Sequence, residues 1–153
     1  MKKYFLLAIL SSVMFLSNLN YAQDGGFGLG VILGNPTGIS AKNWVSERAA
    51  LDFGLGYSFT SNNSLFDFFT DYVIHNTELI QNEENFVVYY GPGARLHIHK
   101  SKSRLGVRGV VGILWLPANS DIDIFVEVAP ILDVIPETKF DFDGGIGLRF
   151  FFN

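Results

Sequence analysis

The sequence predicts an all-β fold, an eight-stranded antiparallel up-and-down transmembrane β-barrel with a filled lumen. Three observations predict it. Short segments alternate apolar residues with polar residues or glycine at a period of two, which is the pattern of strands with one apolar face. Turn residues separate these segments, and beyond the start of the chain no apolar run has the length of a membrane-spanning helix. The chain is also unusually apolar, with fifteen Phe and sixteen Gly.

The start of the chain has the plan of a secretory signal peptide. Two lysines precede an apolar run over residues 4–16, and a short polar stretch follows. We expect residues 1–22 to be the signal peptide and residues 23–153 to be one barrel domain. That domain keeps nine Lys and Arg against fifteen Asp and Glu, a formal charge of −6, and has no basic tract, so nucleic acid is not an expected partner. The sequence has no cysteine, which excludes disulfides and a lipid-modified N-terminus.

The first four strands are separated by turns. Gly alternates with apolar residues over residues 25–33, and the turn Gly34–Gly38 follows. The second strand, about residues 39–45, has no uniformly apolar face. A β-bulge in it would restore the alternation of apolar and polar residues, but the sequence does not fix the position of such a bulge. Residues 51–59 and 65–75 then alternate clearly, with Asp and Gly opposite Leu, Phe and Tyr.

The last four strands follow the longest connection, an acidic segment at residues 76–85. We expect them over residues 86–99, 105–115, 122–134 and 140–152, the last two joined by a short turn into a hairpin. Pro92 and Pro130 fall on the apolar face of their strands, where proline cannot donate a ladder hydrogen bond and accompanies a bulge or bend.

Volume and charge decide which face points inward. The interior of an eight-stranded barrel is just wide enough to be filled by side chains, and the large residues of the apolar face would overfill it. Arg95, Arg108 and Arg149 lie in mid-strand on the glycine-rich face, and an arginine that faces lipid near the midplane costs roughly 2–4 kcal/mol. We therefore expect the glycine-rich face to line the lumen and the apolar face to contact lipid.

Buried charges are tolerated when they are paired, so we expect a structural ion-pair network that closes the lumen. Counting back from a turn at Lys100–Ser103 puts Arg95 opposite Arg108. Two arginines side by side need a carboxylate between them, so Glu127 is expected near both Arg95 and Arg108. Asp123 is expected close to Arg149. The predicted network contains eight residues: Arg95, Arg108, Arg149, Asp52, Asp123, Glu127, Asp141 and Asp143.

Three aromatic residues at strand ends fit the interface between membrane and water: Trp115, Phe150 and Phe152. Phe150 and Phe152 also fit the C-terminal aromatic signal of barrel insertion, although Asn153 follows them.

The sequence evidence for a metal site, a catalytic site or a phosphate-binding loop is weaker. His97 and His99 share a face at a spacing that could chelate a metal, but no third ligand can be named, and hydrogen bonding at the barrel mouth is the simpler interpretation. His99 and Ser101 have the His-x-Ser spacing of the lipid A deacylases, which are also eight-stranded barrels, yet here His99 is phased into the lumen and Ser101 lies in a turn. Asp141 and Asp143 are more simply partners for arginines than a cation site, and GFGLG lacks the helix that a phosphate loop needs. We expect no catalytic residue, metal or cofactor.

Four blocks carry a resemblance over nearly the whole mature chain: GVILGNPTGISAKNW, ALDFGLGYSF, YYGPGARL and DIFVEVAPILDVIPETKFDFDGGIGLRFFF. They look like an uncharacterised bacterial family of small outer-membrane barrels, with spirochaete and Bacteroidetes members, that is similar to the eight-stranded outer-membrane proteins X and A. The resemblance implies a location in the bacterial outer membrane and brings no established catalytic residue.

The sequence therefore predicts a non-catalytic outer-membrane barrel, expected to be a monomer, with a structural or cell-surface interaction role. The expected partners are outer-membrane lipids, the barrel-insertion machinery and an unidentified surface ligand. Three alternatives stay open: a small-solute channel, a lipid-modifying outer-membrane enzyme and a soluble lipocalin-like binder.

Overall fold

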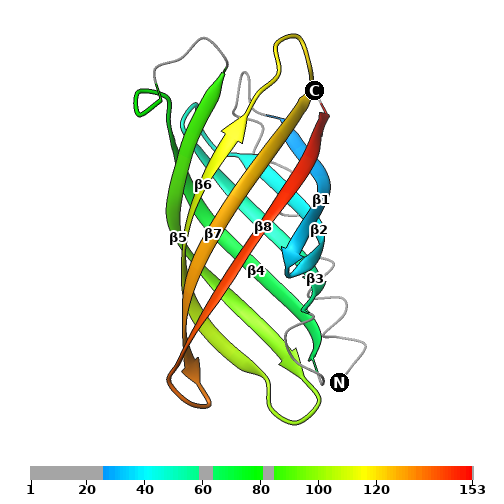
Figure 1. The fold of residues 1–153 in the computed structure, drawn as a ribbon, viewed down its shortest axis with the longest axis vertical. Coiled ribbons are helices and arrows are strands. Elements are labelled where there is room, and N and C mark those ends of the chain that lie inside the picture. The colour runs from blue at the N-terminus through cyan, green and yellow to red at the C-terminus, as the bar shows by residue number, and fades with distance from the viewer. Residues whose placement is uncertain (1–25, 59–63, 81–84, 153) are drawn as a thin grey trace.

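The computed structural model describes residues 26–58, 64–80 and 85–152 and shows a closed antiparallel β-barrel (Figure 1). Each strand pairs with the next along the chain, and the last pairs with the first, which confirms the predicted fold class. The predicted signal peptide, residues 1–22, lies outside the described residues. The eight strands are β1 (Phe27–Asn35), β2 (Thr37–Trp44), β3 (Ala49–Tyr57), β4 (Ser64–Asn76), β5 (Phe86–His99), β6 (Arg104–Trp115), β7 (Ile122–Ile135) and β8 (Lys139–Phe152).

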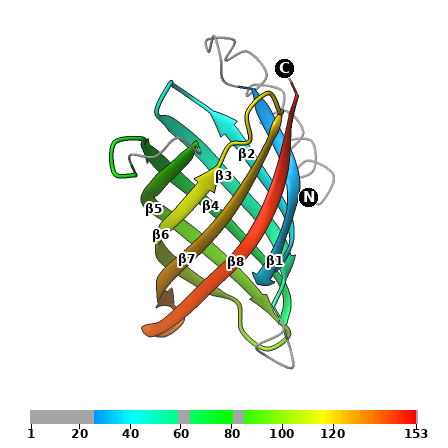
Figure 2. The same ribbon diagram turned by 45° about the horizontal axis from the view of Figure 1, so that its top comes forward.

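The barrel wall is taller on one side than on the other. Strands β1 to β3 have eight or nine residues, whereas β4 to β8 have 12 to 14. The β5–β6 and β7–β8 hairpins consequently extend beyond the β1–β2 turn in both views (Figures 1 and 2). We call the end with these two hairpins the hairpin end, and the opposite end, where β1 starts and β8 finishes, the terminal end. Within the described ranges there is no helix long and apolar enough to cross a membrane.

The two faces of the wall differ in the predicted sense. All three mid-strand arginines are buried inside the barrel, with 2% or less of their surface exposed. Large apolar residues such as Val31, Val107 and Ile146 point outward and are more than half exposed. In a water-soluble barrel such an exterior would be unfavourable, and in a bilayer it replaces water contacts with lipid contacts. The structure confirms that the apolar face is the outer one.

The second strand needs no bulge. Its pairing with β1 and with β3 runs without a shift in register, so the bulge considered for residues 39–45 is absent. Ser40 and Lys42 face the lumen and are buried, while Ile39 points outward. The strand lacks a clean pattern because its inward face includes Trp44, whose ring lies beside the lumenal His75, and its outward face includes Asn43, which pairs with the outward Phe27.

The two strand prolines coincide with interruptions in the ladders. Between β4 and β5 the paired residues skip from Asp71–Gly93 to Ile74–Tyr90, which leaves out Pro92. Between β6 and β7 they skip from Arg108–Ile131 to Val111–Val128, which leaves out Pro130. Each proline lacks the N–H group that the ladder would require at its position.

The two tryptophans provide a test of which face of the barrel wall contacts lipid. Trp115 lies on the outer face and is 39% exposed, whereas the Trp44 ring lies 4.3 Å from that of the lumenal His75. In vesicles that contain brominated lipids we expect strong quenching of fluorescence in the Trp44→Phe variant, which retains only Trp115. The matched Trp115→Phe variant should be quenched much less. Equal quenching of the two variants would contradict the assignment of the faces.

Candidate functional site in the barrel lumen

The lumen is filled by charged side chains. Among the described residues, five cations face eight carboxylates there, and all but two of these thirteen residues are buried. The cations are Lys42, Arg95, Arg104, Arg108 and Arg149, and the carboxylates are Asp52, Asp67, Asp71, Asp123, Glu127, Asp133, Asp141 and Asp143. Such a density of buried charge is tolerated only when each charge has partners.

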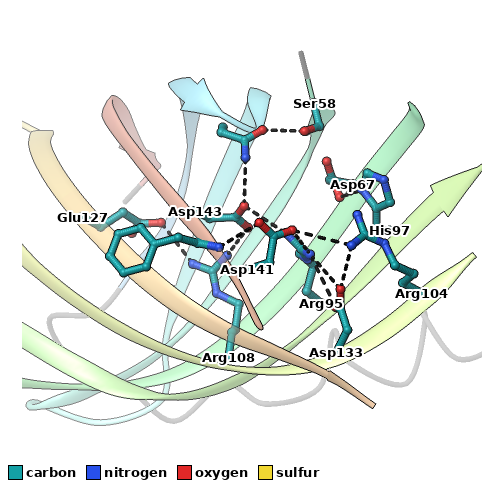
Figure 3. A network of polar contacts seen from close by, with 12 residues as sticks. Ser58, Asp67, Arg95, His97, Arg104, Arg108, Glu127, Asp133, Asp141 and Asp143 are labelled. Carbon is teal, nitrogen blue, oxygen red and sulfur yellow. Dashed lines mark hydrogen bonds and ion pairs between the residues drawn. The ribbon is translucent and has the colours of Figure 1, made fainter. Parts of the chain in front are cut away.

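Toward the hairpin end, Arg95 on β5 contacts carboxylates of β7 and β8 (Figure 3). Its guanidinium lies 2.8 Å from Asp141, 2.9 Å from Asp143 and 3.4 Å from Asp133. Arg104 lies 3.0 Å from Asp133 and shares that carboxylate with Arg95. Because β5 and β8 are not neighbours in the barrel, the contacts of Arg95 with β8 cross the lumen.

Arg108 on β6 occupies the middle of the network. It contacts Asp71 on β4 at 3.0 Å, Glu127 on β7 at 3.3 Å and Asp143 on β8 at 3.5 Å. Tyr89 donates a hydrogen bond of 2.6 Å from its hydroxyl to the other oxygen of Glu127. A single guanidinium thus joins carboxylates from three strands, and it shares Asp143 with Arg95.

Toward the terminal end, Arg149 on β8 pairs with Asp123 of the adjacent strand at 3.0 Å and with Asp52 on β3 at 3.3 Å. Lys42 lies 3.4 Å from Asp52 and 2.9 Å from Nε2 of His75. Asp52 therefore connects the lysine to the arginine across the barrel.

Aromatic rings pack between these charges, and each has a glycine directly opposite on the adjacent strand. Register pairs Phe69 with Gly54, Phe125 with Gly147 and Tyr89 with Gly112. A Cβ atom at any of the three glycines would collide with the ring opposite. Each of the three rings also has a cation over its face. The Arg108 guanidinium lies 4.0 Å from the Phe69 ring centre, that of Arg149 lies 4.1 Å from the Phe125 ring centre, and Nζ of Lys42 lies 4.8 Å from the Tyr89 ring centre. The glycines of the inner face thus make room for rings that support the arginines.

The structure brings the eight residues of the predicted network into ion pairs, but it corrects one detail. Arg95 is not opposite Arg108; the register places Arg95 opposite Gly106 and Arg108 opposite Gly93. The β5–β6 hairpin is centred one residue earlier than the turn assumed at Lys100–Ser103. The two like charges are consequently staggered, which removes a repulsive cross-strand pair. Glu127 contacts Arg108, while Arg95 uses the three aspartates of β7 and β8 instead.

Several lumenal residues were not in the predicted network: Lys42, Asp67, Asp71, His75, Tyr89, Arg104 and Asp133. The alternation of β4 puts Asp67, Asp71 and His75 on one face, so the signal for them was present. Lys42 lies on a strand with no uniformly apolar face, and only the structure assigns it to the lumen.

The histidines make local contacts. Nδ1 of His97 contacts the buried carboxylate of Asp67, and the rings of His97 and His99 lie 6.1 Å apart. Nδ1 of His99 lies within hydrogen-bond distance of two groups of Ser101, its hydroxyl at 2.8 Å and its backbone N–H at 3.2 Å. This geometry is that of a serine that closes the β5–β6 turn. The described ranges contain no group of three or more His, Asp or Glu side chains arranged to hold a metal ion.

The three predicted interface aromatics lie at the terminal end and point outward. Trp115 is the last residue of β6 and stacks with Phe86, with ring centres 6.3 Å apart. Phe150 and Phe152 form an edge-to-face pair on β8 with ring centres 5.2 Å apart. All three are between 39% and 57% exposed, which fits an aromatic belt at a membrane surface.

The class defined by these features is a transmembrane β-barrel with a charged, closed interior. No family model matches the chain, and no curated protein matches it. Among solved structures, the chain is similar to Ail, the attachment invasion locus protein of Yersinia pestis, with 13% identity and a TM-score of 0.35 over 84% of this chain and 95% of that one.

Proposed function

We propose that the chain is a non-catalytic barrel of the bacterial outer membrane, with its lumen closed and its role structural or in surface interaction. The observation that supports it best is the position of Arg108, which bridges carboxylates from three different strands in the middle of the barrel. Further bridges from Arg95 and Arg149 cross the lumen on either side of it. An ion would have to break several charge-assisted contacts to pass, because these side chains occupy the path.

A conductance measurement tests the closed lumen. In planar bilayers we expect the purified protein to insert without a stable conductance step. A porin inserted under the same conditions is the positive control, and heat-modifiable migration on a gel confirms that the protein is folded. A large, stable conductance of the folded protein would favour the small-solute channel and contradict the proposal.

We also propose that the outward aromatic pair at the end of β8 is read by the barrel-insertion machinery. Phe150 and Phe152 point outward near the end of β8 and are about half exposed, so both rings are accessible to a protein that contacts this strand. In cells we expect Phe152→Ala to lower the fraction of folded, heat-modifiable protein in outer-membrane preparations severalfold. The matched Phe140→Ala variant, an equally outward phenylalanine at the other end of β8, should assemble normally. Equal assembly of both variants would contradict the insertion role.

The same proposal includes four further points. The chain belongs to the family suggested by the sequence blocks, it is exported by a signal peptide, it is a monomer, and it has no catalytic activity. Mass spectrometry of lipid A from cells with and without the protein tests the last point, because a lipid-modifying enzyme would change the mass of the lipid. Extraction into aqueous buffer without detergent would instead favour the lipocalin-like alternative.

A further inference from the structure

Asp71 on β4 lies directly opposite another buried carboxylate. The β3–β4 register pairs it with Asp52, and both residues face the lumen with 3% or less of their surface exposed. Directly opposite residues of an antiparallel pair have Cβ atoms about 4.5–5.5 Å apart, and like charges at such positions repel each other. On its other side Asp71 faces Gly93 of β5, which has no side chain to pair with it. One of two carboxylates that share a buried site commonly retains a proton.

The two carboxylates differ in their partners. Asp52 contacts two cations, Lys42 at 3.4 Å and Arg149 at 3.3 Å. The ion pairs of the described residues give Asp71 one cation, Nε of Arg108 at 3.0 Å. That contact lacks hydrogen-bond geometry, because neither oxygen of Asp71 nor Nε of Arg108 makes a hydrogen bond within the described part of the chain. Asp71 is therefore the less stabilised anion of the two.

The charges around Asp71 do not balance. Toward the terminal end two cations balance two carboxylates, and Asp67 has His97 as its partner. In the rest of the lumen the described residues place three arginines, and Lys139 opposite Asp133 at the mouth, among five carboxylates. The arginines are Arg95, Arg104 and Arg108, and the carboxylates are Asp71, Glu127, Asp133, Asp141 and Asp143. One negative charge is left over, and Asp71 is the carboxylate of these five that accepts no hydrogen bond.

From the opposed carboxylates, the missing hydrogen bonds and the excess charge we propose that Asp71 holds a proton in the folded barrel at neutral pH, and that loss of this proton at alkaline pH opens the lumen. A buried carboxylate that lacks partners lowers its free energy by becoming neutral. The neutral acid does not repel Asp52 and brings the charges of the network into balance. The proton is independent of the proposed function, whereas the opening rests on the proposed closure of the lumen.

Ionised Asp71 would disturb the middle of the network. It would add a negative charge opposite Asp52 and beside Arg108, whose contacts with carboxylates of β7 and β8 hold these strands together across the lumen. The repelling carboxylates would then separate. The charged and titratable side chains that face Asp71 are Asp67 and His75 on β4, Asp52 on β3, Arg95 on β5, Arg108 on β6, Glu127 on β7 and Asp143 on β8.

The pH dependence of unfolding tests the proton. An unfolded aspartate is ionised at neutral pH, so a proton that Asp71 holds in the barrel is released when the barrel unfolds, and stability falls as the pH rises. We expect the unfolding equilibrium constant of wild type to increase about tenfold more per pH unit than that of Asp71→Asn, in urea titrations in lipid vesicles around neutral pH. Because asparagine has the shape of the neutral acid, Asp71→Asn should be at least as stable as wild type.

Asp123→Asn is the matched control, because it makes the same change at a carboxylate that accepts hydrogen bonds from Nε of Arg149 at both oxygens. It should lower stability at neutral pH and keep the pH dependence of wild type. Equal pH dependence of wild type and Asp71→Asn would overturn the proton. A loss of stability in Asp71→Asn as large as that in Asp123→Asn would overturn it as well, in favour of an ionised Asp71 that pairs with Arg108.

Conductance in planar bilayers tests the opening. We expect folded wild type to be closed at neutral pH and to conduct at alkaline pH, whereas Asp71→Asn should stay closed at both. Wild type that stays closed at alkaline pH would overturn the opening. Wild type that conducts at neutral pH would instead contradict the proposed closure of the lumen, and the comparison of unfolding in wild type and Asp71→Asn would still decide whether Asp71 holds the proton.

Discussion

Replacing Arg149 by methionine is expected to lower the free energy of unfolding by about 3–5 kcal/mol, because a buried ion pair that loses one partner leaves uncompensated charge. The guanidinium is 1% exposed and is the partner of Asp123 at 3.0 Å and of Asp52 at 3.3 Å. Asp52 retains Lys42, but Asp123 has no other cation among the ion pairs of the described residues. Urea titration of the heat-modifiable form in lipid vesicles measures the loss.

Two controls separate the buried charge from the loss of a side chain. Arg48→Met makes the same chemical change at an exposed position and should shift stability by less than about 0.5 kcal/mol. Asp123→Asn combined with Arg149→Met should recover a large part of the loss, since it removes the unpaired carboxylate. A double variant as unstable as Arg149→Met would show that the arginine acts through another contact, such as the Phe125 ring beneath it.

The period-two pattern was sufficient to predict the lumenal face for the eight charged residues of the expected network, but it did not assign Lys42 on β2 to the lumen. It also does not predict which side chains contact one another across the lumen. Asp123 and Arg149 were expected together because their strands form a hairpin, in which a short turn sets the register. Arg95 meets Asp143 from a strand that is not its neighbour, and that contact depends on the tilt and stagger of the whole barrel. No local pattern contains this information.

The register error at the β5–β6 hairpin has the same origin. A turn of four residues can be centred at more than one position, and a shift by one residue changes every cross-strand pair of the hairpin. The stagger of Arg95 and Arg108 is decided by the repulsion that it avoids and by the aspartates that each arginine reaches in the closed barrel. The inward aromatic rings were missed for a related reason: Phe69 fits inside only because Gly54 lies opposite, and that pairing is visible only in the register.

The pairing of lumenal rings with glycines predicts that adding one methyl group at Gly54 destabilises the barrel. Its Cβ atom would enter the space of the Phe69 ring, which is buried under Arg108 and cannot move away without disturbing that cation. We expect Gly54→Ala to lower the free energy of unfolding by about 1–3 kcal/mol, the usual cost of overpacking. The measurement is the same urea titration in lipid vesicles.

Gly109→Ala is the matched control, because it makes the same change at a mid-strand glycine on the outer face. No atom lies within 4 Å of the added Cβ, so we expect no loss and a gain of up to about 1 kcal/mol from the reduced freedom of the unfolded chain. Phe69→Leu in the Gly54→Ala background should restore part of the stability, since a shorter side chain frees the space that the methyl group needs. If Gly54→Ala and Gly109→Ala had equal stability, the lumenal rings would not require a glycine on the strand opposite. A loss in Gly54→Ala that Phe69→Leu relieves would instead establish ring and glycine as one packing unit of the closed lumen.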